Sequence, residues 1–167
     1  NYYGLVSGRG YTGGIESDIS TVITYSTADN WLSDNGIIAY LITWTVFKSS
    51  SARGFRLGYL PDKKGLKVCE IGDLTRLQPF QDASNQTAIY IARKVSTYKK
   101  SEFKSTPCYI WFPKERISRV PSSWSLDQVY TSFDILPGAA CSVGEWGSPL
   151  FTGDINHYKD SVFLKGS

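Results

Sequence analysis

The sequence predicts a fold of the α/β class, and three segments carry that prediction. Residues 37–47 (IIAYLITWTVF) form an apolar run of β-branched and aromatic residues, which is typical of a strand buried on both faces. Residues 87–92 (TAIYIA) predict a second buried strand. Residues 18–34 begin with Asp18, a good N-cap, and predict a helix. A helix followed by a buried strand is half of a βαβ unit, which favours α/β architecture.

Spacing and turn residues predict the other elements. Although β-branched content also permits a strand, residues 18–34 have apolar side chains at helical spacing, namely Ile19, Val22, Ile23, Trp31 and Leu32. The pair Asn35-Gly36 predicts the turn that ends this helix. Residues 66–71 predict a short strand, and residues 125–133 predict a short helix that Pro137-Gly138 ends. Residues 1–17 predict a glycine-rich loop without nucleotide-binding spacing.

Basic residues are concentrated in two parts of a chain whose net charge is +3. Residues 48–67 contain six basic residues and one acid, and residues 93–119 contain eight basic residues and two acids. If the two blocks lie on one side, they present a positive face to a polyanion. The alternative is a pair of ordinary solvated faces. The 14% aromatic content is explained either by core packing or by stacking on bases or sugars, and composition alone does not distinguish the two.

The cysteines follow no metal-binding or disulfide pattern. Cys69, Cys108 and Cys141 are odd in number and far apart, and His157 is the single histidine. We therefore expect no metal site and a reducing, intracellular compartment. No apolar run is long enough to span a bilayer and no signal peptide opens the chain, so we expect no membrane partner. The absence of methionine predicts that the chain was cut from a larger polypeptide.

Two stretches of the chain resemble large adenine-N6 DNA methyltransferases of the restriction-modification type. Residues 17–58 resemble the segment after the catalytic motif of that family, with the helix start Asp18-Ile19-Ser20 and the strand Gly36-Ile37 through Thr43-Trp44-Thr45-Val46-Phe47-Lys48. Residues 66–94 resemble the next strand, the Asp73-Leu74 turn, the Pro79-Phe80 loop, and the last core strand. Residues 107–111 look like the exit from the catalytic domain, and residues 147–150 like the approach to the target-recognition region.

The resemblance implies the later half of a Rossmann-like methyltransferase sheet. It divides the chain into a partial catalytic domain, residues 1–119, and a linker with the start of a mixed target-recognition region, residues 120–167. Enzymes of this family flip an adenine out of the duplex and transfer a methyl group to N6 from S-adenosylmethionine. Implied partners are double-stranded DNA and the rest of the parent polypeptide, and the implied location is the cytoplasm of a bacterium or archaeon.

Two motifs of the family are missing from the chain. The Asn/Asp/Ser-Pro-Pro-aromatic motif is absent because no two prolines are adjacent, and no glycine-rich cofactor loop follows a strand. We therefore expect no catalytic residue in this chain. The chain alone should bind no cofactor and be inactive, because S-adenosylmethionine would be held by the rest of the parent polypeptide.

The expected site residues are one aromatic and three cations. Phe80 matches the family position where a ring stacks on the flipped base, but from the residues alone it is as readily a core residue that anchors its loop. Lys48, Arg53 and Arg56 follow the first strand at the carboxyl edge of the sheet, where they either contact DNA phosphates or are solvated loop cations. Asp73 either caps the turn that follows it or orients a substrate group.

Two other classes of function are compatible with the sequence. A non-catalytic DNA-binding or specificity module is favoured by the missing catalytic motif and the two basic blocks, and its binding should depend on salt. An aromatic-rich domain that binds carbohydrate or protein is the third reading, and its binding should be independent of salt. The long apolar run at residues 37–47 argues against a small all-β lectin-like fold.

Overall fold

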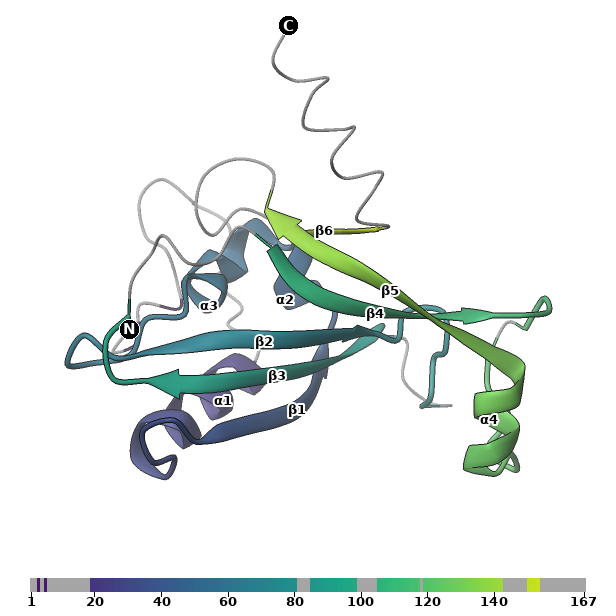
Figure 1. Ribbon diagram of the computed structural model, residues 1–167, viewed down its shortest axis with the longest axis horizontal. Helices are drawn as coiled ribbons and strands as arrows, with labels where there is room; N and C mark the ends of the chain where they lie inside the picture. The colour runs from purple at the N-terminus through teal and green to yellow at the C-terminus, as the bar shows by residue number, and fades with distance from the viewer. Residues whose placement is uncertain are drawn as a thin grey trace, which may run out of the picture.

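A mixed sheet with helices forms the framework of the protein. In the computed structural model, the described residues are 3, 5, 19–80, 85–98, 105–117, 119–142 and 150–153. Six strands within them follow the order β1-β3-β2-β4-β5-β6 (Figure 1). The strands are β1 (Ile37–Thr43), β2 (Gly65–Asp73), β3 (Thr87–Val95), β4 (Ser105–Pro113), β5 (Phe133–Ser142) and β6 (Leu150–Gly153). The helices are α1 (Ile19–Asn30), α2 (Thr45–Lys48), a 3₁₀ turn (Ser50–Ala52), α3 (Arg53–Leu57) and α4 (Leu126–Ser132).

The two apolar segments that predicted the fold are neighbours in this sheet. Strands β1 and β2 both pair antiparallel with β3, which lies between them. Strands β1 and β2 are therefore parallel to each other, and β4 pairs parallel with β2. Strands β5 and β6 extend the sheet by antiparallel pairing. The α/β class is confirmed, with a mixed rather than an all-parallel sheet.

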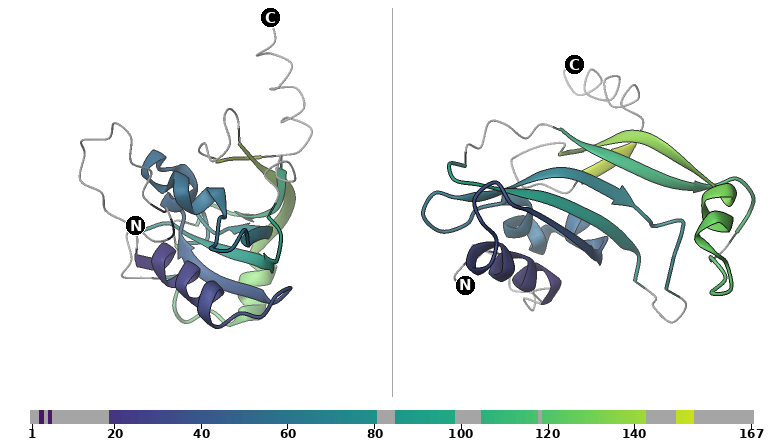
Figure 2. Two further views of the ribbon diagram at one scale, coloured as in Figure 1. Left: turned by 90° about the vertical axis from the view of Figure 1, so that its left-hand side faces the viewer. Right: turned by 60° about the horizontal axis from the view of Figure 1, so that its bottom comes forward.

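The first strand is shorter and more exposed than predicted. Strand β1 ends at Thr43, and the residues that follow turn into the short helix α2. Ile38 and Ile42 are buried, whereas the Ile37 and Leu41 side chains are 56% and 55% exposed. The prediction of a strand buried on both faces was wrong, because helices α1, α2 and α3 lie on one face of the sheet (Figure 2).

Helix α1 forms where it was predicted but buries a different face. Its buried residues are Thr21, Thr24, Tyr25 and Ala28. Ile19 and Ile23, two of the apolar residues that predicted the helix, point outward and are 74% and 50% exposed. Asp18, the predicted N-cap, lies outside the described residues. The Tyr25 ring decides the orientation, because it packs 5.8 Å from the Phe55 ring and donates its hydroxyl to the Phe55 carbonyl oxygen.

Aromatic rings fill the space between the sheet and the helices. Phe55 packs 5.1 Å from Tyr90 of β3 and 6.3 Å from Phe47 of α2, measured between ring centroids. All three side chains are almost completely buried. Much of the aromatic content therefore serves core packing, the first of the two readings of the composition.

The second half of the chain continues the same sheet. Strand β4 was not predicted, because Pro107 and the surrounding polar residues mask its alternation of buried and exposed positions. Helix α4 is confirmed and carries a capping box between Ser125 and Gln128. The pair Pro137-Gly138 was predicted to end this helix, and that prediction was wrong. The pair lies inside β5, opposite Tyr109 and Cys108. The sheet thus runs across residue 120, where the resemblance placed a domain boundary.

Candidate functional site

The site is built at the edge of the sheet where the parallel strands β1 and β2 end. Ligands in α/β proteins gather outside the carboxyl ends of parallel strands. Here β1 ends at Thr43 and β2 ends at Asp73. The backbone N–H of Trp44 donates to the carbonyl oxygen of Gln86 at 2.8 Å, so the exit from β1 is joined to the entry into β3.

Asp73 shapes the turn that leaves β2. Its side chain is only 5% exposed. One carboxylate oxygen, Oδ1, accepts a hydrogen bond from the backbone N–H of Thr75 at 3.0 Å. The other, Oδ2, accepts from the hydroxyl of Thr152 in β6 at 3.3 Å. The turn-capping role considered for Asp73 is thus confirmed, and the two bonds compensate for burial of the carboxylate.

The turn after Asp73 carries the chain to Phe80. The N–H groups of Leu77 and Gln78 both donate to the carbonyl oxygen of Leu74 at 3.1 Å. Leu74 and Leu77 are buried in a second core cluster together with Val120 and Phe133. Phe80 follows this anchored turn, and its side chain is 46% exposed. The ring is therefore accessible from solvent and is not a sealed core residue.

Lys48 lies at the end of α2 and contacts β6. Its ammonium donates to the carbonyl oxygen of Leu150 at 2.8 Å and lies 5.4 Å from the centroid of the Trp44 ring. Partial burial lowers the pKa of Lys48, and the negative charge of Asp73 opposes that shift. Lys48 and Asp73 therefore belong to the same electrostatic neighbourhood.

The two arginines of α3 occupy different environments. Arg53, the first residue of the helix, has an exposed side chain. Arg56 is half-buried, and its Nη1 donates to the carbonyl oxygens of Val46 and Ser49 at 2.6 and 2.7 Å. Burial, and secondarily the charge of Arg53, lower the pKa of Arg56 to about 10. Arg56 thus holds the connection between α2 and α3 together, which leaves less of its guanidinium for a ligand.

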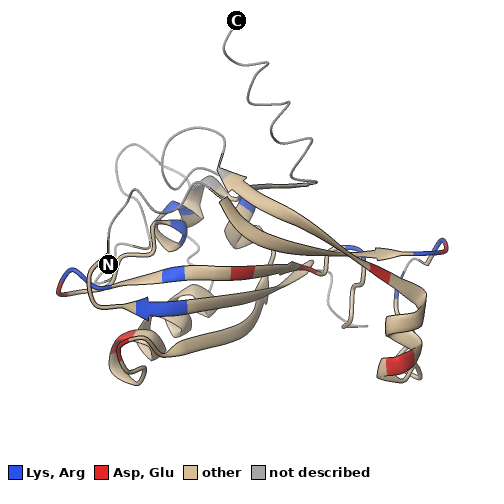
Figure 3. Cartoon of the chain, viewed as in Figure 1, with Lys and Arg blue, Asp and Glu red and all other residues tan. Residues whose placement is uncertain are grey.

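The described basic residues do not merge into one continuous face. In Figure 3 they fall in separate places, on the α2–α3 segment, on strands β2 and β3, and near the tip of β4. One of them, Lys94 of β3, is buried and bonded to the end of α1. Within the described part of the chain, the reading of a single broad cationic side is therefore not supported.

Cys108 lies beside Asp73 and has an unreactive thiol. Burial, together with the charge of Asp73, raises the pKa of its thiol to about 12. The thiol is therefore protonated at neutral pH and is a poor nucleophile. All three cysteines are free. Among the described residues, no group of three histidine, cysteine or acidic side chains is close enough to hold a metal ion. The single histidine, His157, lies outside the described residues.

Two contacts of this edge were missed from the sequence. Thr152 reaches Asp73 across 79 positions of the chain, and no local pattern marks such a contact. The guanidinium of Arg76 lies 4.6 Å from the centroid of the Phe112 ring, which is 41% exposed. The position of Arg76, three residues before Pro79, was the only hint in the sequence of a cation near the Phe80 loop.

Comparisons with models of protein families and with curated proteins find no match to this chain. No helix in the described part of the chain is both long and apolar enough to cross a membrane.

Proposed function

We propose that this chain is the base- and DNA-handling part of a site-specific DNA methyltransferase that transfers a methyl group from S-adenosylmethionine to adenine N6. The observation that carries the proposal is the exposed Phe80 ring, which follows the turn at the carboxyl end of β2. An aromatic ring at that place is what the sequence resemblance expects for stacking on a flipped adenine. The parallel arrangement of β1 and β2 supports the same reading, since it gathers their carboxyl ends at one edge.

The proposed role of Phe80 is to hold the extruded base. Moving a base out of the duplex costs a few kcal/mol of lost stacking and pairing. Stacking on an aromatic side chain offsets about 1–3 kcal/mol of that cost. The turn of residues 74–78 is anchored just before the ring, because the N–H groups of Leu77 and Gln78 are bonded to the Leu74 carbonyl oxygen and its two leucines are buried.

The described residues do not fit a site for S-adenosylmethionine. Strand β1 runs directly into the short helix α2, and β2 runs into the turn at Leu74. Neither exit has the glycine-rich loop that brings backbone close to a nucleotide-like cofactor. We therefore assign the cofactor and the catalytic motif to the rest of the parent polypeptide.

An uncovered apolar surface supports packing against further polypeptide. Ile37 and Leu41 lie on the face of β1 opposite helices α1–α3, and β1 is an outer strand of the described sheet. Exposed apolar side chains that form contiguous patches mark interaction surfaces. This surface is where we place the contact with the rest of the parent polypeptide.

Binding to an unpaired adenine tests the proposed function. We expect the chain to bind a duplex with adenine opposite an abasic site at least roughly fivefold more tightly than the fully paired duplex, because less unstacking is needed. Fluorescence anisotropy measures both affinities. A duplex with abasic sites on both strands controls for flexibility and should show no gain. Equal affinity for all three duplexes would contradict base handling and favour the non-catalytic DNA-binding module.

Arg53 provides a test of phosphate contact. Replacing Arg53 with alanine should reduce the steepness of the dependence of log affinity on log salt by about 0.9, the effect of one phosphate contact. Arg53 is suited to this test because its side chain is exposed at the start of α3. Arg93→Ala on β3 is the matched control and should leave the slope unchanged. An unchanged slope in Arg53→Ala removes Arg53 from the DNA interface.

A further inference from the structure

We propose that Asp73 and Thr152 act together as positioning residues for Phe80, so that the short strand β6 controls the turn that presents the stacking ring. The inference rests on the proposed function for its consequence on base binding. Its structural part, the coupling of β6 to the turn, stands on the hydrogen bonds alone. Neither residue is proposed to touch the base.

Asp73 is fixed from both sides before it reaches the turn. In the sheet it lies opposite Ala88 of β3 and opposite Ile110 of β4. Its backbone therefore cannot move without breaking strand pairing. The carboxylate is buried, and buried charge is tolerated only where hydrogen bonds replace water. Each of its two oxygens has one such bond, to Thr75 and to Thr152.

The two bonds of the carboxylate point to different parts of the protein. The bond to the Thr75 N–H fixes the start of the turn. Further along the turn, the N–H groups of Leu77 and Gln78 donate to the carbonyl oxygen of Leu74. Gln78 then adopts a left-handed conformation with φ of 43°, two residues before Phe80. The bond to the Thr152 hydroxyl fixes the orientation of the carboxylate itself. A rotation of the carboxylate would misalign the oxygen that Thr75 uses.

Strand β6 also contacts Lys48, the cation that follows the end of β1. The carbonyl oxygen of Leu150 accepts from the Lys48 ammonium at 2.8 Å, two residues before Thr152. In Figure 1, β6 lies beside α2 at the end of β5. One short strand thus bonds to the residue that shapes the Phe80 turn and to the proposed phosphate-contacting lysine. Its displacement would alter both at once.

The test compares two substitutions of the same threonine. Thr152→Val removes the hydroxyl and keeps the shape of the side chain, whereas Thr152→Ser keeps the hydroxyl. We expect Thr152→Val to speed hydrogen exchange of the Thr75, Leu77 and Gln78 amides roughly fivefold, as for the loss of one ordinary hydrogen bond. The urea midpoint should fall by no more than the loss of one hydrogen bond predicts, exchange in β3 should speed up less than exchange in the turn, and Thr152→Ser should restore the wild-type rates. Thr106→Val, a buried threonine of β4, is the matched control.

Base binding supplies the second readout. Thr152→Val should also reduce the preference for the duplex with unpaired adenine, and Thr152→Ser should restore it. Unchanged exchange in the turn overturns the coupling. Faster exchange with an unchanged adenine preference overturns the positioning role. If the wild-type chain shows no adenine preference, the proposed function fails, and the exchange rates still decide the coupling. Should Thr152→Val not fold, Thr152→Ala, which also lacks the hydroxyl, is measured in its place, with the turn again exchanging faster.

Discussion

Replacing Lys94 with methionine is expected to lower the free energy of unfolding by about 3 kcal/mol. The Lys94 side chain is only 3% exposed, although a lysine at the end of an apolar strand segment is usually solvated. Its ammonium donates to three carbonyl oxygens at the end of α1 and beyond, those of Ala28, Asp29 and Leu32, at 2.8, 3.0 and 2.9 Å. Methionine fills the space but leaves these acceptors without a donor. A cation at the carboxyl end of a helix also favours the helix dipole.

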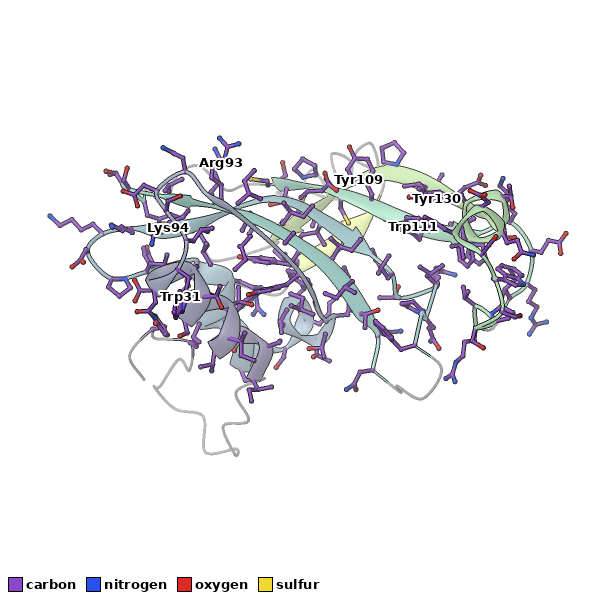
Figure 4. The ribbon with its side chains drawn as sticks, turned by 90° about the horizontal axis from the view of Figure 1, so that it is seen from below. Trp31, Arg93, Lys94, Tyr109, Trp111 and Tyr130 are labelled. Atoms are coloured by element: carbon purple, nitrogen blue, oxygen red, sulfur yellow. The ribbon has the colours of Figure 1, made fainter. Side chains whose placement is uncertain are left out.

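Urea unfolding followed by circular dichroism measures this loss, and the melting temperature should fall by roughly 10 °C. The adjacent residue gives a matched control. In Figure 4, Lys94 points toward α1 and Arg93 points to the other side of β3. Arg93 has an exposed side chain, so Arg93→Met should change the stability by less than about 0.5 kcal/mol. A Lys94→Met chain as stable as the Arg93→Met chain would show that the three bonds contribute little.

Helix α1 illustrates how far periodicity reaches. Apolar spacing predicted the presence of the helix, and Asn35-Gly36 predicted a turn, at which Asn35 adopts a left-handed φ of 66°. The helix itself already ends at Asn30, before that turn. The buried face was not predictable from the same pattern. Tyr25 and Ala28 face the sheet, whereas Ile19 is 74% exposed. A tyrosine ring with a buried acceptor for its hydroxyl fits this core better than the aliphatic face does, and such an acceptor is visible only after folding.

The strands show the same division between local and distant information. The segment around Tyr90 was predicted because an apolar run marks a buried strand, and residues 66–71 were predicted as a shorter strand. The position of β2 in the sheet was not predicted, because no local pattern shows that it pairs with β3 on the side opposite β1. Lys94 was counted with the surface cations, since nothing in the local sequence shows that the end of α1 lies beside it.

The candidate site divides along similar lines. Asp73 as a turn cap and Phe80 as a residue of the following loop both follow from adjacent residues. The contact with Thr152 depends on the path of two further strands, β4 and β5, before β6 returns to the edge. Arg56 was grouped with Lys48 as a phosphate ligand because sequence gives charge but not direction. Its guanidinium is in fact bonded to backbone oxygens of the preceding segment.

Replacing Phe80 with alanine is expected to remove the preference of the chain for unpaired adenine. The ring is 46% exposed, so its loss leaves no buried cavity, and stability should change by less than about 1 kcal/mol. Loss of stacking worth about 1–3 kcal/mol corresponds to a reduction of roughly 5- to 150-fold in affinity for the duplex with unpaired adenine. Affinity for the paired duplex, which depends on phosphate contacts, should be unchanged. Fluorescence anisotropy with both duplexes measures the two effects separately.

Two further variants distinguish stacking from a general apolar contribution of the ring. Phe80→Trp offers a larger face and should keep or increase the adenine preference, whereas Phe80→Leu keeps apolar volume and should lose most of it. Phe112, a phenylalanine of similar exposure that lies against Arg76, is the matched control, and Phe112→Ala should retain the preference. If Phe80→Leu binds unpaired adenine as tightly as the wild-type chain, the ring acts only as an apolar anchor of its loop. The flipped base would then have to be held by residues of the parent polypeptide.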